Sequence, residues 1–231
     1  MTPPWFVLMR HRLPRNIKLV IFDLDGTLVD AYRAIADSVN YMLKKMGRRP
    51  VSLRKVTRSV GWGVSSLVGI FIEDSRTAEA LGLFRRHHDQ RLRQNIRLLK
   101  GARPLLDFLR RKNIRLAIAS NRPVRFCKLI LKTLDIDQYF DFVICGDMVK
   151  RAKPYPDMVN AILKKAKVRP SEAIYVGDMS VDILCGKRAR VMTVGIPTGS
   201  CTREEILAEK PDLLVERLTE LKQAVAKQIP A

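Results

Sequence analysis

The hydrophobic pattern alternates between two kinds of segment over most of the chain. Short apolar runs rich in Val and Ile have the length and composition of strands buried on both faces; they cover residues 19–22, 114–119, 142–145, 173–176, 191–194 and 213–215. Segments with apolar residues at helical spacing flank them, at 104–112, 123–134, 157–166, 181–188 and 218–227. Such alternation through short connections predicts an α/β domain with a doubly wound, parallel (Rossmann-like) sheet.

A different pattern occupies residues 31–100. Here the apolar positions predict helices over 31–46, 52–60, 67–72 and about 76–98, and no strand. This change of periodicity marks a helical module inserted into an α/β domain. The sequence thus predicts a core domain of residues 18–31 and 100–231, an all-helical inserted domain of residues 32–99, and an N-terminal extension of residues 1–17.

Composition narrows the class of protein. No apolar run approaches the ~20 residues of a membrane-spanning helix, and 47% hydrophobic residues exclude general disorder. The four cysteines form no Cys-x-x-Cys pair and have no neighbouring His at metal-ligand spacing. They are interpreted as buried thiols of a reducing compartment. We expect a cytoplasmic protein, either a monomer or a homodimer, that does not bind membranes.

The formal net charge of +20 is unusual and is concentrated in the insert. Residues 31–100 hold fifteen Lys and Arg against five Asp and Glu, about half of the total charge. Such a field attracts anions and could hold nucleic acid through phosphate contacts. Trp62 and Phe84 of the insert could stack on bases, but the aromatic content of the chain is low, at 6%. A solvated basic surface is therefore favoured over a nucleic-acid site, which stays an alternative.

Two carboxylates follow the first strand-like run. Asp23 and Asp25 are two residues apart, which would place them on the same side of a continuing strand, and Gly26 then allows a sharp turn. Ligands of open α/β sheets bind beyond the carboxyl ends of the strands. Since like charges this close repel each other, the pair implies a bound metal, a shifted protonation state, or both.

Three more polar features recur at strand ends or helix starts of the core. Ser120 and Asn121 follow one strand, Lys153 precedes a proline, and Asp178 and Asp182 follow another strand. Each has an ordinary explanation alone, as a helix cap, a solvated lysine or a turn former. Together with Asp-Leu-Asp-Gly-Thr at residues 23–27, their order and context resemble the four motifs of the haloacid dehalogenase superfamily. The resemblance extends over the chain from residue 18 onward.

The resemblance implies a magnesium-dependent hydrolase or transferase of phosphate. Asp23 would be the nucleophile that forms an aspartyl-phosphate, and Asp25 the general acid and base. Mg²⁺ would be bound by Asp23, the main-chain carbonyl of Asp25 and Asp178, with Asp182 ordering its water shell. The expected phosphate-binding residues are Thr27, Ser120, Asn121 and Lys153.

An Asp two residues after the nucleophile indicates a phosphatase or phosphomutase in this superfamily, and an insert between the first two motifs corresponds to its helical cap. The sequence of the first motif is most similar to that of the phosphoglycolate-phosphatase-like subgroup. A basic run at residues 187–190 departs from the subgroup and puts the substrate in doubt.

The sequence therefore predicts a Mg²⁺-dependent phosphatase that acts on a small phosphorylated metabolite. The alternatives are a phosphomutase of the β-phosphoglucomutase type and a nucleic-acid-associated phosphatase that uses the basic cap. Arg58 and Trp62 are the candidate specificity residues of the cap: Arg58 could pair with a substrate carboxylate, whereas ordinary packing is an equally good interpretation of Trp62.

Overall fold

The centre of the molecule is a six-stranded parallel sheet. The computed structural model describes residues 13–72 and 75–228, so that most of the predicted N-terminal extension lies outside the described residues. The strand order is β5-β4-β1-β6-β7-β8, with every neighbouring pair parallel. The bounds are β1 (Leu19–Phe22), β4 (Arg115–Ser120), β5 (Phe142–Cys145), β6 (Ala173–Gly177), β7 (Met192–Gly195) and β8 (Leu213–Leu214). This arrangement confirms the predicted doubly wound α/β fold.

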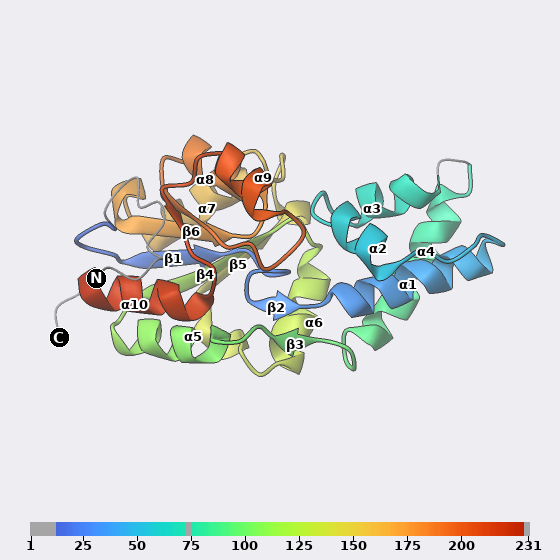
Figure 1. Ribbon diagram of the computed structural model, residues 1–231, viewed down its shortest axis with the longest axis horizontal. Helices are drawn as coiled ribbons and strands as arrows, with labels where there is room; N and C mark the ends of the chain where they lie inside the picture. Colours follow the sequence, from blue (N-terminus) through green and yellow to red (C-terminus); the bar gives the residue numbers. More distant parts are fainter. Residues whose placement is uncertain (1–12, 73–74, 229–231) are drawn as a thin grey trace.

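Helices cover both faces of the sheet (Figure 1). Helices α5 (Ala102–Arg111), α6 (Val124–Thr133) and α10 (Leu218–Gln228) lie on one face, and α7 (Asp157–Ala166) and α8 (Ser180–Arg188) on the other, with α9 (Arg203–Ala208) beside α8. Successive side chains of β1 point to opposite faces. Val20 and Phe22 accordingly belong to the first of these cores, and Leu19 and Ile21 to the second. Double-sided burial explains the continuous apolar runs in the sequence.

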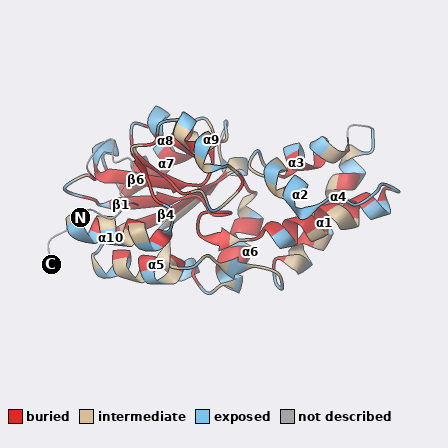
Figure 2. Cartoon of the chain, viewed as in Figure 1, coloured by how far each residue is buried: buried red, intermediate tan, exposed pale blue. Residues whose placement is uncertain are grey.

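The insert consists of four helices that pack against one another at one end of the core (Figures 1 and 2). They are α1 (Tyr32–Lys45), α2 (Leu53–Ser59), α3 (Val64–Phe71) and α4 (Thr77–Arg91). Helix α1 packs along α4 and also contacts α2, whereas α3 contacts α4. The side chain of Ser52 accepts a hydrogen bond from the backbone N–H of Lys55 and so caps α2.

The prediction of a helix and no strand over residues 76–98 was wrong, and one helix of the core was missed. The helix expected over residues 76–98 ends at Arg91, and a short strand, β3 (Arg97–Leu98), pairs antiparallel with β2 (Val29–Asp30). The two connections between core and insert lie side by side there, so their backbones bond to each other. Helix α9 was not predicted, although Thr202 and Glu205 form a capping box at its start.

Three short 3₁₀ turns connect the larger elements: η1 (Asp137–Tyr139), η2 (Gly146–Met148) and η3 (Pro170–Glu172). The four cysteines are free, and three of them are buried. No helix among the described residues is long and apolar enough to cross a membrane.

Candidate active site

The central strands bring the predicted motifs together at their carboxyl ends. Asp23 follows β1, Ser120 ends β4, and Asp178 follows β6. Phe22 at the end of β1 is in register with Ile118 of β4 and Val176 of β6, so the residues that follow these strands meet at one edge of the sheet. The loop before α7 adds Lys153, and the first turn of α8 adds Asp182.

Asp23, Asp178 and Asp182 form a buried group of carboxylates. They offer oxygens that all lie within 4.8 Å of one another, and the three residues are 6%, 0% and 1% exposed. Burial is the main reason that the pKa of Asp23 is raised to about 7. The charge of Lys153 lowers this pKa, and the charges of Asp182 and Asp25 raise it. Burial and then the charges of Asp23 and Asp182 raise the pKa of Asp178 well above its ordinary value. Both shifts disfavour the charged form of these carboxylates, mainly because the carboxylates are buried and also because they lie near one another.

The donor set therefore fits a small divalent cation such as Mg²⁺, which prefers oxygen ligands and keeps part of its water shell. Asp23 and Asp178 would bind it, as would the backbone carbonyl of Asp25, and Asp182 would order the surrounding water. Burial is the largest cause of the raised pKa values of Asp23 and Asp178, and the charges of neighbouring carboxylates, which a cation would offset, add to it.

Neighbouring donors orient Asp178. Thr27 Oγ1 donates to its Oδ1 at 3.1 Å, and the backbone N–H of Ser200 donates to its Oδ2 at 2.9 Å. The hydroxyl of Tyr32 lies 3.4 Å from Oδ2. Thr27, which the sequence suggested for phosphate binding, thus holds a carboxylate of the acidic group in this structure. A β-carbon at Gly199 would collide with Asp178 Oδ2, so this close approach requires glycine.

Lys153 lies between two of the carboxylates. Its Nζ is 2.6 Å from Asp23 Oδ1 and 2.7 Å from Asp182 Oδ1, and the residue is 5% exposed. Burial alone would lower the pKa of Lys153, but the charges of Asp182 and Asp23 outweigh it and raise this pKa above the ordinary value of 10.5. The amine therefore stays charged beside the nucleophile candidate. On its other side, Asp182 Oδ1 also accepts a hydrogen bond from Tyr175 at 3.0 Å.

Asn121 connects the core loops to the insert. Its side-chain amide donates to the backbone carbonyls of Gly61, at 2.8 Å, and Lys153, at 3.2 Å, and its Oδ1 accepts from the backbone N–H of Lys153 at 2.9 Å. Ser120 is 3% exposed, and its Oγ accepts from the backbone N–H of Arg122. The hydroxyl proton of Ser120 is left to donate toward the cavity that Ser120 lines.

Arg122 and His88 belong to this region although the sequence did not single them out as site residues. Arg122 donates from Nε and Nη2 to the two carboxylate oxygens of Asp25, at 2.7 and 2.9 Å. Its Nη1 lies 2.7 Å from Nε2 of His88, which comes from α4 of the insert. The sequence could have indicated Arg122, because this cationic residue directly follows the Ser120-Asn121 motif. Its pairing with His88 depends on tertiary structure.

A cavity between core and insert opens onto these groups. The core contributes polar residues to its lining, and Val64, Leu67 and Phe84 of the insert contribute apolar side chains. Its volume is about 50 Å³. The structure does not bring Arg58 and Trp62 into this cavity: Arg58 binds Glu205 and the carbonyl of Ser200 at an exposed position, and Trp62 is 55% exposed.

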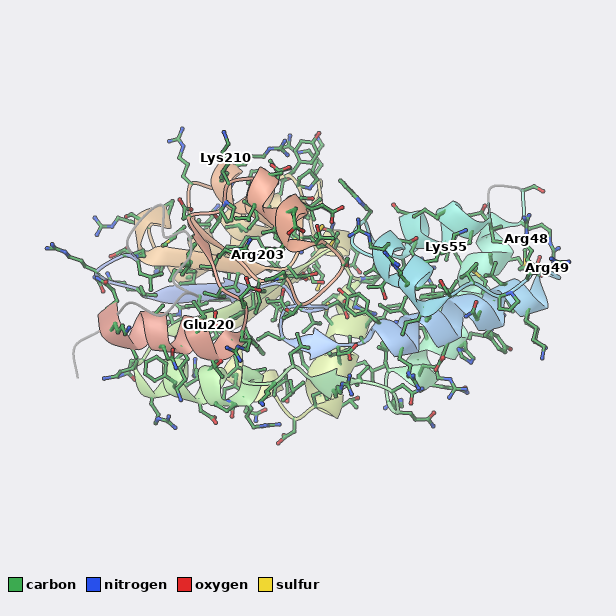
Figure 3. The ribbon with its side chains drawn as sticks, in the orientation of Figure 1. Arg48, Arg49, Lys55, Arg203, Lys210 and Glu220 are labelled. Atoms are coloured by element: carbon green, nitrogen blue, oxygen red, sulfur yellow. The ribbon has the colours of Figure 1, made fainter. Side chains whose placement is uncertain are left out.

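The basic residues of the insert that Figure 3 labels are on its outer surface. Arg48 and Arg49 follow α1 at the end of the insert farthest from the sheet, and Lys55 projects from α2; all three are exposed. These side chains do not line the cavity described above. These three cations therefore lie apart from the buried carboxylates.

The structure combines a doubly wound α/β core, an inserted helical module and a buried acidic site at the carboxyl ends of the central strands. A family model described as haloacid dehalogenase-like hydrolase matches residues 20–196, and the chain belongs to this family. A phosphoglycolate phosphatase of Pseudomonas fluorescens is 34% identical over 223 residues, covering 93% of this chain and 80% of that protein. One from Vibrio parahaemolyticus is 32% identical, covering 92% and 97%.

Solved structures are similar as well. The crystal structure of a predicted phosphoglycolate phosphatase from Haemophilus somnus superposes with a TM-score of 0.82 at 26% identity, and the match covers 90% of this chain and 98% of that one. The family and these relatives make the chain an enzyme, a phosphatase of the haloacid dehalogenase type.

Proposed function

We propose that this enzyme hydrolyses a small phosphate monoester, with 2-phosphoglycolate as the first candidate, through an aspartyl-phosphate on Asp23. The observation that carries the proposal is the position of Asp23. Its carboxylate contacts Lys153 and, with Asp178 and Asp182, forms a group of carboxylates suited to Mg²⁺. The similarity to phosphoglycolate phosphatases over more than nine-tenths of the chain supports the choice of substrate.

In the first step, a carboxylate oxygen of Asp23 attacks phosphorus, and the bond from phosphorus to the leaving oxygen breaks. Asp25, which is paired with Arg122 as a carboxylate in this structure, must first take up a proton. It then gives this proton to the leaving oxygen, so the substrate leaves as an alcohol. In the second step, water attacks phosphorus and transfers a proton to Asp25, and the bond to Asp23 breaks. Inorganic phosphate is released and both aspartates return to their starting state.

The surrounding residues position and neutralise the phosphoryl group. Lys153 would hold one of its oxygens, and the hydroxyl of Ser120 would donate to another. Bound Mg²⁺ would lower the repulsion between the phosphate and the carboxylates of Asp23 and Asp178. A transferring phosphoryl group bears charge that is spread over its oxygens, so fixed donors of this kind stabilise it.

The cavity favours a small leaving group. The helices of the insert border it, and its apolar lining from Val64, Leu67 and Phe84 helps to exclude water around a small ester. Helices α1–α4 would then form a cap domain over the site, as the sequence suggested. A polymeric substrate would require a different placement of these helices.

The proposal is tested by phosphate release from a panel of esters with Mg²⁺ or with EDTA. The panel contains 2-phosphoglycolate, sugar phosphates, nucleotides, pyrophosphate and 3′-phosphorylated oligonucleotides. We expect Mg²⁺-dependent turnover with the highest kcat/KM for 2-phosphoglycolate or another small ester. Preferred turnover of an oligonucleotide would contradict the substrate class, and formation of an isomeric sugar phosphate in place of inorganic phosphate would indicate a mutase.

A further inference from the structure

A chain of buried polar groups runs from Asp25 into the helical insert. It begins with the bidentate ion pair in which Arg122 Nε and Nη2 donate to Asp25, at 2.7 and 2.9 Å. Arg122 is 7% exposed and Asp25 9%. A bidentate pair of this kind fixes the plane of the carboxylate as well as its position, because the guanidinium is rigid and planar.

His88 continues this chain from the other side of the cavity. His88 is fully buried, and its Nε2 lies 2.7 Å from Nη1 of Arg122. Because a guanidinium can only donate, Nε2 must accept, and the ring proton is then on Nδ1. Nδ1 lies 3.1 Å from Ser38 Oγ, which donates in turn to the carbonyl of Ala34 at 2.8 Å.

The imidazole of His88 is fixed in a neutral state. Burial, followed by the charge of Arg122, lowers the pKa of His88 to about 2. The rings of Phe84 and Phe126 pack on it, with centroids 4.8 and 5.1 Å away. The neutral imidazole accepts a hydrogen bond from Nη1 of Arg122. Because it carries no charge, it does not weaken the ion pair between Arg122 and Asp25.

We propose that Arg122 is a positioning residue that orients the carboxyl group of Asp25 for proton transfer, and that His88 of the insert holds Arg122 in this orientation. The inference rests on the proposed role of Asp25 as general acid and base. Its consequence is that the geometry of the acid depends on the insert. Asp25 and Arg122 belong to the core, whereas His88 comes from α4, so the chain is complete only when His88 contacts Arg122 and Phe126 of the core.

The contacts favour this role over direct binding of a substrate anion. Nε and Nη2 form the edge of Arg122 that matches a carboxylate, and both already donate to Asp25. A substrate carboxylate could take this edge only by displacing the general acid. All three residues line the same cavity as Asp23, so the pairing lies where proton transfer would occur.

The test compares His88→Leu, which removes the acceptor, with His88→Gln, whose side-chain oxygen can replace Nε2. The probes are 2-phosphoglycolate, whose alkoxide must be protonated as it leaves, and acetyl phosphate, whose acetate leaves without a proton. The rate of the first step is measured for each in single turnover with excess enzyme and Mg²⁺. Both variants keep Arg122 and Asp25, which limits the risk of misfolding.

We expect His88→Leu to slow the first step about tenfold or more with 2-phosphoglycolate and less than about threefold with acetyl phosphate, because only the former needs the acid. His88→Gln is expected to restore most of the loss. An equal loss with both probes would overturn the inference and leave His88 a structural residue. A raised KM for 2-phosphoglycolate with unchanged kcat would overturn it as well, since Arg122 would then bind the substrate.

The proposed function and this inference fail in different ways. If wild-type protein loaded with Mg²⁺ turns over neither probe, the proposed function fails. If the wild type turns over both probes and His88→Leu slows the first step equally with both, only the inference fails. Nuclear magnetic resonance of ¹⁵N-labelled imidazole provides an independent readout: we expect His88 to remain neutral with its proton on Nδ1 down to about pH 5. A proton on Nε2 would exclude the acceptor role.

Discussion

The Nζ atom of Lys153 lies 2.6 Å from Oδ1 of Asp23. The same amine lies 2.7 Å from Asp182, so Lys153 has two carboxylate partners. Arg122, in contrast, forms an ion pair with only one carboxylate in the described part of the chain, that of Asp25. Removal of one aspartate would therefore leave Lys153 with a second carboxylate partner but would remove the carboxylate partner of Arg122.

This difference predicts unequal effects of two amide substitutions on stability in EDTA. Asp25→Asn leaves the buried guanidinium of Arg122 without its carboxylate, and we expect a loss of roughly 3–5 kcal/mol in the free energy of unfolding. Asp23→Asn leaves Lys153 paired with Asp182 and relieves repulsion in the acidic group, so it should cost clearly less. Urea unfolding measures both, and a larger loss for Asp23→Asn would contradict the assignment of partners.

Metal binding should stabilise the folded protein through Asp178. At a Mg²⁺ concentration of about 100 times Kd, the wild type should gain about 2.7 kcal/mol. Asp178→Asn should lose most of this gain, while its metal-free stability stays within about 1 kcal/mol of the wild type. The amide can still accept from Ser200 and donate to Thr27, and the repulsion from neighbouring carboxylates is reduced. Equal stabilisation of both proteins by Mg²⁺ would place the cation elsewhere.

The close approach of Gly199 to Asp178 gives a matched pair of glycine substitutions. Gly199→Ala should displace the carboxylate and weaken Mg²⁺ binding at least tenfold, because its β-carbon would collide with Asp178 Oδ2. Gly69→Ala is the control: it lies within α3, where an added β-carbon meets nothing within 4 Å, and it should stabilise the protein by up to about 1 kcal/mol. Mg²⁺ titrations that are unchanged in Gly199→Ala would contradict this geometry.

His88 predicts a dependence of stability on pH. Burial and then Arg122 lower its pKa from the ordinary 6.5 to about 2 in the folded state. Between these values the unfolded chain binds a proton that the folded chain does not, so this contribution is fully present above about pH 6.5 and is lost as the pH falls. From pH 7 to 5.5 the loss is about 1 kcal/mol.

The matched control for this prediction is His88→Gln, which has no titrating ring. Urea unfolding at the two pH values should show a steeper loss for the wild type than for the variant. His87, whose pKa is also lowered by burial and then by Arg91, is present in both proteins and adds a change of the same sign. Parallel losses in the two proteins would show that His88 titrates normally.

The sequence predicted those parts of the structure that depend on local patterns. The strand at 142–145 and the helix at 157–166 have the predicted bounds, since buried runs and helical spacing define them. Asp23 and Asp178 were expected at one edge of the sheet because parallel strands present their carboxyl ends there. Lys153, which lies in the loop before α7, was included only because the four motifs resemble those of the haloacid dehalogenase superfamily.

The remaining features depend on contacts between distant residues. His88 was one of two histidines in a basic segment, and nothing in that segment indicates that its ring meets Arg122, which is 34 residues away in the chain. Likewise, Arg58 was expected to approach the substrate, and the structure places it against Glu205 of α9, a helix that had not been predicted. Partners of this kind are decided by how the insert packs on the core.

The most direct test of the account is a rapid acid quench of the wild type and of Asp23→Asn with 2-phosphoglycolate and Mg²⁺, followed by mass spectrometry of the peptide that contains residue 23. The account predicts transient phosphorylation of Asp23 in the wild type, formed and lost at rates that support the measured phosphate release, and neither phosphorylation nor phosphate release in Asp23→Asn. Continued phosphate release by Asp23→Asn, or a phosphoryl group on another residue, would contradict Asp23 as the nucleophile.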